Sequence, residues 1–398
     1  MFFMYNERIL LHSLLMIQRI SHVEIRETLG QYPIIALTGP RQSGKTTLLK
    51  LMFSDFRYVN LETPDTRDFA LKDPRGFLAE YNSKVIFDEV QRVPELFSYL
   101  QSLVDESRLM GQFVLSGSQN FHLMERITQS LAGRVVMFKL FPFEFHEMKS
   151  AGWLSDDIPE VFTKGFYPAL FERKSDQDRY YANYIDTYVK RDVSQLINIQ
   201  DNRTFNNFIK MCATRAGQLL NFNDLARDVG VSHSTIRNWL SILETSYIAF
   251  TLPPYYANFG KRIIKSSKLY FYDVGLLCHL LNIRKGDISP LNAMWGNIFE
   301  NMVVSELVKQ NYHSNLLRDY YFWRDSNGNE IDLLYMKGES LIIYEIKASK
   351  TIKEDMFKGL RYFNKITNSD VVEQYLIYGG DVPQKRTDLE VLPWSSVH

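Results

Sequence analysis

The sequence predicts an α/β protein with two separate sheets, of which the first is parallel and covered by helices on both faces. Five apolar, strand-like segments alternate with helical segments near the start, at residues 32–38, 56–62, 84–87, 112–115 and 135–138. Residues 142–200 are mostly helical in pattern, and a second group of strands follows a helical run in the last third. These observations predict a parallel sheet, a helical connector and a second α/β domain, in that order.

Composition bounds the partners of the protein. The chain has 398 residues, enough for two or three domains, and its 46 Lys and Arg balance 46 Asp and Glu. Because the chain has no net positive charge, any contact with nucleic acid must come from local basic patches. Cys212 and Cys278 lie too far apart in sequence to indicate a disulfide framework or a zinc site, and they fit a reducing cytosol. No signal peptide and no apolar run of spanning length is recognisable, so we expect a cytoplasmic protein without a membrane partner.

The first strand-like segment leads into a loop that reads Gly-Pro-Arg-Gln-Ser-Gly-Lys-Thr over residues 39–46, and a helical pattern follows it. This strand–loop–helix context is what a phosphate-binding loop requires. Gly39 and Gly44 let the backbone wrap a polyphosphate, Lys45 is placed for the β- and γ-phosphates, and Thr46 for Mg²⁺. The predicted nucleotide-binding residues here are Gly39, Pro40, Arg41, Gln42, Ser43, Gly44, Lys45, Thr46 and Thr47.

The third strand-like segment ends in two acids, Asp88 and Glu89. A buried strand that delivers acids at its carboxyl end is the Walker B arrangement. It predicts that Asp88 holds Mg²⁺ and that Glu89 polarises the attacking water as a general base. The fourth segment ends in a serine-rich turn, where Ser116 or Ser118 is either a sensor of the γ-phosphate or an ordinary turn residue.

An arginine is the remaining candidate of this first domain. Arg134, just before the fifth segment, is predicted to stabilise transition-state charge, either in its own chain or in a neighbouring subunit. Arg126 and Arg41 compete for the same role. An ordinary surface arginine is the alternative for each of them.

Residues 31–141 resemble an AAA+-type P-loop ATPase domain through GPRQSGKTT, VIFDEVQRVP, VLSGSQ and SLAGR. Together with Glu89, the strand expected at 56–62 indicates the additional-strand branch of these ATPases. The run from Asp88 to Pro94 is especially similar to prokaryotic ATPases that carry a poorly characterised C-terminal domain, and this resemblance extends over nearly the whole chain after Met16. It implies that the protein binds ATP with Mg²⁺ and hydrolyses it.

The middle of the chain shows a helix-turn-helix pattern. Helices are expected at 222–229 and 232–244, with Gly230 in the turn and Ser232 as N-cap, and a strand at 247–252 completes a winged helix. The functional interpretation is DNA binding, supported by a basic cluster among aromatic residues; the alternative is packing or protein contact, since the second helix is poor in basic residues. The basic cluster consists of Lys261, Arg262, Lys265 and Lys268.

The last third brings four chemically distinctive residues into register. Glu345 and Lys347 are two apart on one expected strand, so they share a face, and Asp332 on the preceding hairpin strand can lie beside them. Two carboxylates can hold Mg²⁺, and the lysine can activate a water beside a phosphate. With Glu300 as the helical acid, this set resembles the PD-(D/E)XK nuclease fold, a restriction-endonuclease-like domain that also exists in inactive forms.

The predicted domains are an ATPase domain over 16–145, a helical connector over 146–215, a winged-helix domain over 216–285 and a nuclease-like domain over 286–398. We expect an enzyme that hydrolyses ATP and acts on DNA. The alternative is an ATP-driven switch whose C-terminal domain only binds DNA or a protein. The expected partners are a nucleotide, DNA, and a second copy of the chain or another protein.

Overall fold

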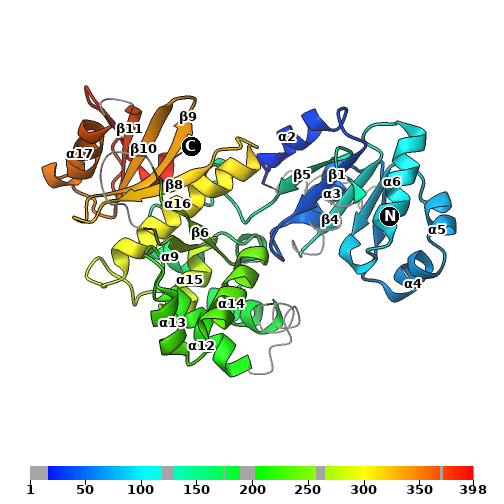
Figure 1. The fold of residues 1–398 in the computed structure, drawn as a ribbon, viewed down its shortest axis with the longest axis horizontal. Coiled ribbons are helices and arrows are strands. Elements are labelled where there is room, and N and C mark those ends of the chain that lie inside the picture. Colours follow the sequence, from blue (N-terminus) through cyan, green and yellow to red (C-terminus); the bar gives the residue numbers. More distant parts are fainter. Residues whose placement is uncertain are drawn as a thin grey trace.

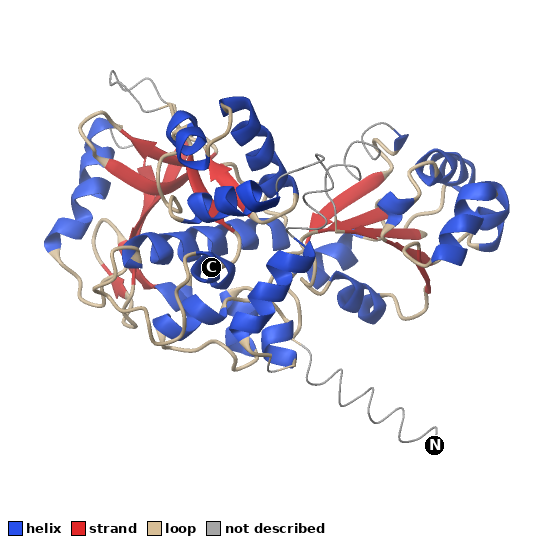
Figure 2. Cartoon of the chain, turned by 90° about the horizontal axis from the view of Figure 1, so that it is seen from below, coloured by secondary structure: helices blue, strands red, loops and turns tan. Residues whose placement is uncertain are grey.

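The computed structural model describes residues 17–118, 130–173, 175–188, 202–256, 265–367 and 371–397. Two β-sheets lie at opposite ends of the molecule, with a helical body between and below them in the view of Figure 1. Figure 2 shows the same separation from a second direction. Within the described ranges, no helix is both long and apolar enough to span a membrane.

The first sheet has five parallel strands in the order β2-β3-β4-β1-β5, which confirms the predicted parallel sheet. Its segments are α2 (Ser21–Thr28), β1 (Ile34–Thr38), α3 (Lys45–Met52), β2 (Arg57–Asn60), α4 (Pro64–Lys72), α5 (Pro74–Glu80), β3 (Val85–Asp88), η1 (Val90–Arg92), α6 (Leu96–Ser107), β4 (Phe113–Gly117) and β5 (Val135–Lys139). The strand that separates β1 from β3 is β4. The segment expected at 56–62 instead forms β2, at the edge of the sheet.

Alternating side chains of these strands feed two hydrophobic clusters, one on each face. Ile34, Phe87 and Leu115 pack with α5 and α6, whereas Ile35 and Val114 pack with α2 and α3 on the other side. Burial on both faces explains why the strands read as continuous apolar runs.

The middle of the chain is helical, as predicted. Its elements are α8 (Phe145–Ser150), α9 (Ile158–Lys164), α10 (Ala169–Glu172), α11 (Gln177–Tyr184), α12 (Asn202–Ala213), α13 (Phe222–Val229), α14 (His233–Thr245), β6 (Ala249–Leu252), β7 (Lys268–Phe271) and α15 (Val274–Leu280). The Ser232 side chain caps α14 by accepting from the amide of Thr235. The helix pair and β6 follow in the expected order, and β6 pairs antiparallel with β7. Lys261 and Arg262 lie outside the described residues.

The second sheet has six strands in the order β12-β13-β11-β10-β9-β8. Its segments are α16 (Trp295–His313), β8 (Tyr320–Arg324), β9 (Glu330–Lys337), β10 (Ser340–Lys347), η3 (Glu354–Phe357), α17 (Lys358–Ile366), β11 (Val371–Tyr378), β12 (Gln384–Lys385), β13 (Glu390–Pro393) and η4 (Trp394–Ser396). β8, β9 and β10 form an antiparallel meander, and β11 joins β10 in parallel.

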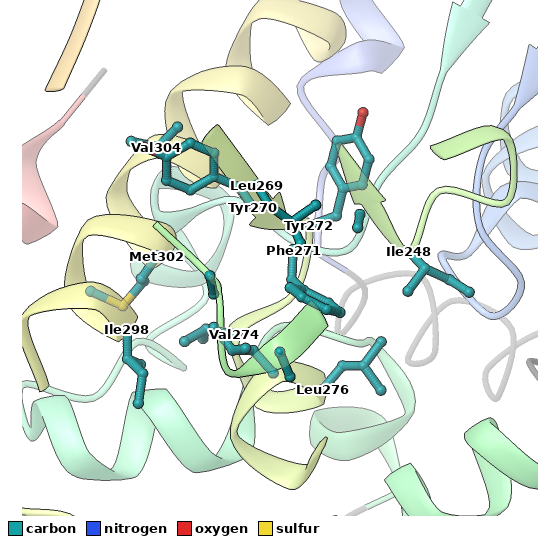
Figure 3. Packing of buried hydrophobic residues seen from close by; sticks show 14 of the residues in the cluster. Ile248, Leu269, Tyr270, Phe271, Tyr272, Val274, Leu276, Ile298, Met302 and Val304 are labelled. Atoms are coloured by element: carbon teal, nitrogen blue, oxygen red, sulfur yellow. The ribbon is translucent and has the colours of Figure 1, made fainter. Parts of the chain in front are cut away.

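Helix α16 is the central element of the C-terminal body. It lies against β7 and β10 and also reaches β5 of the first sheet. Figure 3 shows Ile298, Met302 and Val304 of α16 among the side chains of the β7 segment. One continuous cluster of buried side chains extends from Phe141 to Val397, so the helical middle and one face of the second sheet share a core.

Candidate functional sites

The loop between β1 and α3 has the backbone of a phosphate cradle. Gly39 and Gly44 have φ angles of 144° and 96°, in the range that disfavours residues with a side chain. A Cβ atom on Gly39 would lie 2.1 Å from the carbonyl oxygen of Leu140. A side chain at position 39 would therefore push the loop away from Leu140, so this backbone path requires glycine there.

Lys45 lies inside this cradle. Its ammonium is buried and donates to the carbonyl oxygens of Gly39 (2.9 Å) and Pro40 (2.7 Å). Burial lowers the pKa of Lys45 to about 8, although Glu89 and Asp88 oppose that shift. A buried ammonium with a lowered pKa gains from an anion beside it, so the residues fit a bound phosphate.

Asp88 joins the loop to the neighbouring strands. Its Oδ2 accepts from the Thr46 hydroxyl (2.9 Å) and the Tyr58 hydroxyl (2.6 Å), and its Oδ1 accepts from Ser116. The structure thus brings Thr46 and Asp88, the two residues expected to hold Mg²⁺, into direct contact. It places Ser116 against Asp88 rather than at the open side of the site.

Glu89 follows Asp88 in a left-handed backbone conformation, with a φ of 55°. Its Oε2 accepts from the Ser118 hydroxyl (3.2 Å) and from the Gln91 side chain. Of the two candidate serines, Ser118 is therefore the one that touches the expected general base. Glu89 and Ser118 both line the adjoining cavity.

That cavity has a volume of about 410 Å³. Residues of the loop form one wall, and Pro168, Ala169, Glu172 and Arg173 of the α10 segment form another. The side chain of Arg41 extends from the loop toward the helical middle, with its guanidinium 5.8 Å from the ring of Tyr188. The nucleotide site is consequently bordered by both the first domain and the helical body.

Arg134 lies beside the amino ends of the strands, whereas the phosphate loop lies at their carboxyl ends. The amide of Ile34, at the start of β1, donates to the Arg134 carbonyl, while the phosphate loop follows the end of β1. The five residues of β1 span roughly 16 Å between these two ends. The guanidinium binds both carboxylate oxygens of Asp105, at 2.6 and 2.8 Å. Arg134 therefore lies away from the phosphate loop of its own chain and is paired with Asp105. Arg126 lies outside the described residues.

The second candidate site lies on the neighbouring strands β9 and β10 of the second sheet. Pairing of Tyr344 with Leu333 sets Glu345 beside Asp332, and the Asp332 carboxylate accepts from the amide of Ile346 (2.8 Å). Lys347 forms ion pairs with Glu345 and, at 3.7 Å, with Asp332. Burial and then Asp332 raise the pKa of Glu345 to about 8.

Lys268 completes this acidic site. The side chain is 3% exposed, and its ammonium lies 2.8 Å from Glu300 Oε1 and 3.9 Å from Asp332 Oδ1 and also pairs with Glu330. Burial disfavours the charged ammonium, but Glu300 and its neighbours outweigh burial and raise the pKa of Lys268. Three of the four predicted residues, Glu300, Asp332 and Lys347, line one cavity of about 520 Å³ together with Lys268. Glu345 does not line that cavity and reaches the set through its ion pair with Lys347.

The hydrogen-bond partners of the carboxylates show whether these residues fit a metal ion. Oε2 of Glu345 is buried and has no hydrogen-bond partner within the described part of the chain. This unpaired oxygen leaves Glu345 able to accept a further ligand, so Asp332 and Glu345 fit a divalent cation. The side chain of Glu300 is different, because Lys268 and Tyr270 (2.7 Å) already donate to its Oε1.

Sequence reasoning missed several residues that the fold brings to the two sites. Lys268 belonged to the predicted basic cluster, and no local signal indicates that its strand inserts it among acids. Tyr58 shows the same difficulty, since a hydroxyl reveals its partner only in three dimensions. The exposed face of α14 carries Arg237, whose guanidinium lies 5.4 Å over the ring of Phe222.

Three family models match successive parts of the chain. One, described as an AAA domain, matches residues 31–149. Two domains of unknown function, DUF8612 and DUF4143, match residues 155–287 and 295–397. Lys268 and Glu300, which pair directly, belong to different matched domains.

Individual proteins are also similar. The uncharacterized protein Rv2008c of Mycobacterium tuberculosis is 31% identical over 337 residues, which cover 84% of this chain and 74% of that protein. The uncharacterized protein Mb2031c of Mycobacterium bovis matches with the same values. Among solved structures, the Walker-type ATPase PABY2304 of Pyrococcus abyssi matches with a TM-score of 0.43 and 13% identity, covering 65% of this chain and 94% of that one. The chain therefore belongs to the family of these two mycobacterial proteins, and its N-terminal part is an AAA-type ATPase domain.

Proposed function

We propose that this protein binds ATP together with Mg²⁺ and hydrolyses it between the phosphate loop and the end of β3. One observation carries the proposal: the Thr46 hydroxyl lies 2.9 Å from Asp88 Oδ2. This contact joins the two halves of a hydrolysis site that are 42 residues apart in the chain. The AAA domain match over the same residues supports it.

The residues have distinct roles in this proposal. Lys45 and the amides at the start of α3 hold the β- and γ-phosphates. Glu89 accepts a proton from the attacking water, and Ser118 orients its carboxylate. Mg²⁺, held by Thr46 and Asp88, would neutralise charge on the phosphates.

Release of phosphate from ATP tests the proposal. Lys45→Ala should abolish binding of ATP, because it removes the cation that faces the phosphates. Glu89→Gln should retain binding but slow turnover by roughly 10²- to 10⁴-fold, as expected for loss of a general base. Lys72→Ala, at an exposed lysine of α4, is the control and should leave both unchanged. Normal turnover by Glu89→Gln would show that Glu89 is not the base.

We propose a second activity, metal-dependent cleavage of DNA, at the acidic site of the second sheet. The observation that favours it is that Glu300, Asp332 and Lys347 line one surface cavity, with Glu345 ion-paired to Lys347. In this proposal Asp332 and Glu345 hold a divalent cation that polarises the phosphodiester, and Lys347 orients the attacking water.

A plasmid-cleavage assay with Mg²⁺ or Mn²⁺ tests this second activity. Cleavage that Lys347→Ala abolishes would support it. The exposed Lys358 lies outside the site, and Lys358→Ala should cleave normally. An intact plasmid under all metal conditions, with normal ATP turnover, would instead favour an ATP-driven switch whose C-terminal domain only binds DNA or a protein.

We also propose that Arg134 acts on the ATP of a neighbouring copy, in a cytoplasmic homo-oligomer. Its distance from the loop of its own chain supports a role between subunits. Mixing Arg134→Ala subunits with Lys45→Ala subunits tests this. Partial recovery of ATP turnover in the mixture is expected, because an Arg134→Ala copy keeps its phosphate loop and a neighbouring Lys45→Ala copy supplies the arginine. No recovery from two folded, associating variants would contradict the role.

A further inference from the structure

A buried set of polar side chains connects the last turn of α16 to the phosphate loop. It consists of Arg19, Glu147, Glu144 and His313, of which the first is 6% exposed and the other three are at most 1% exposed. The set joins the segment before α2, the segment after β5 and the C-terminal body. No role in the proposed chemistry accounts for it.

Arg19 makes three directed contacts. Its Nε donates to Glu147 Oε1 (2.9 Å), one terminal nitrogen donates to the carbonyl of Ser43 in the phosphate loop (2.9 Å), and the other donates to the carbonyl of Phe141 (2.6 Å). The guanidinium also lies 5.0 Å from the ring centre of Phe143. Each of the three guanidinium nitrogens therefore donates to a specific partner.

The contact with Ser43 determines an orientation inside the loop. A trans peptide is planar, so its carbonyl and its amide hydrogen point in opposite directions. When Arg19 holds the Ser43 carbonyl, the amide of Gly44 points away from Arg19. Gly44 has a φ of 96° and no side chain, so its own conformational preference leaves this peptide free to turn.

The remaining contacts lead to α16. The Glu144 amide donates to Glu147 Oε2 (3.0 Å), and the Glu144 carboxylate pairs with His313 Nδ1. The Phe141 amide donates to His313 Nε2 (2.9 Å), so that nitrogen is the acceptor and Nδ1 carries the hydrogen. Burial lowers the pKa of His313 to about 3, which agrees with a neutral ring.

A metal ion is a poor explanation of this cluster. Glu144, Glu147 and His313 each place one ligand-type atom within 4.8 Å of the others. However, Arg19 and main-chain amides already donate to these groups. Burying such a charged set is expensive compared with apolar packing, which points to a role beyond stability.

We propose that Arg19 is a positioning residue for nucleotide binding, and that α16 holds Arg19 in place through His313, Glu144 and Glu147. Arg19 orients the Ser43–Gly44 peptide so that its amide faces the phosphates. This role rests on the proposed ATP site. It makes the affinity of the loop for ATP dependent on His313 of α16.

Titration with the fluorescent analogue mant-ATP, together with steady-state ATP hydrolysis, tests the role. Arg19→Met keeps the aliphatic bulk but loses the directed donors, so Kd for mant-ATP and KM for ATP should rise roughly 10- to 100-fold, with kcat less affected. Arg19→Lys retains the positive charge and one donor group that can extend toward Ser43. It should therefore recover part of the lost affinity. His313→Leu should raise Kd by a smaller factor.

Lys309→Met is the matched control. Lys309 is a buried cation of the same region that pairs with Glu306 (2.8 Å) and the Phe143 carbonyl, without contact to the loop. Its loss should lower the thermal midpoint but leave the Kd for mant-ATP unchanged. An equal rise in Kd for Lys309→Met and Arg19→Met would assign the effect to general destabilisation and overturn the proposal.

Other outcomes are equally decisive. Wild-type protein that binds no mant-ATP would overturn the ATP site itself. Wild-type binding with an unchanged Kd in Arg19→Met would overturn only the role of Arg19. If circular dichroism shows that Arg19→Met is unfolded, an unchanged Kd in folded Arg19→Lys would overturn it. An unchanged Kd in folded His313→Leu would remove α16 from the proposal.

Discussion

Replacing Lys268 with methionine should strongly destabilise the C-terminal body. Methionine preserves most of the packing but removes the cation shared by Glu300, Glu330 and Asp332, whose side chains are 16%, 21% and 8% exposed. Breaking a buried ion pair by removing one partner costs about 3–5 kcal/mol, because it leaves uncompensated charge. For a body of this size, that loss lowers the thermal midpoint by roughly 6–20 °C.

The pH dependence has a definite sign. The pKa of Lys268 is raised in the folded protein, so its contribution is complete below the unfolded value and is lost only as pH rises through the folded pKa. Between about pH 6 and 9 the wild-type contribution from this group should be constant. In Lys268→Met the unpaired acids take up protons more readily, so the deficit should shrink toward about pH 5.

Thermal and urea unfolding followed by circular dichroism measure this deficit. The double variant Lys268→Met with Glu300→Gln should regain part of the loss, since one unpaired charge is removed with its partner. Lys72→Met, at an exposed pair with Asp68, is the control and should change stability by less than about 0.5 kcal/mol. A loss below about 1 kcal/mol in Lys268→Met at pH 8 would refute the buried ion-pair reasoning.

Three further results are expected. Gly39→Ala should weaken mant-ATP binding, because a Cβ 2.1 Å from the Leu140 carbonyl oxygen forces the loop to shift; binding within a factor of about three of wild type would contradict the loop geometry. ATP affinity should be constant in acid and fall by up to about tenfold per pH unit above pH 8, since phosphates favour the protonated form of Lys45, whose pKa burial lowers to about 8; titrations from about pH 6.5 to 9.5 measure this. Asp273→Ala should lower the unfolding free energy by roughly 3 kcal/mol, because the Asp273 carboxylate accepts three hydrogen bonds from the core; urea unfolding checks it against Asp224→Ala at an exposed site.

Local patterns predicted the elements well, since hydrophobic periodicity and capping residues act over a few neighbours. The five strands of the first sheet and Ser232 as the cap of α14 occur as expected. The order of strands was less accessible. The segment 57–60 lies between the loop strand and the Asp88 strand in sequence, yet it forms the edge of the sheet, because pairing between strands depends on the whole layer.

The sequence by itself determined that the loop from Gly39 to Thr46 precedes a helix and that acids end the third strand. Glycine conformations, apolar strands and motif spacing are local properties, so they can be read without a fold. Only the tertiary structure decided that Arg134 lies far from its own loop, that Lys268 enters the acidic site, and that Arg19 links the loop to α16. Those relations depend on which segments the packed core brings together, such as Phe141 and His313, which are 172 residues apart in the sequence.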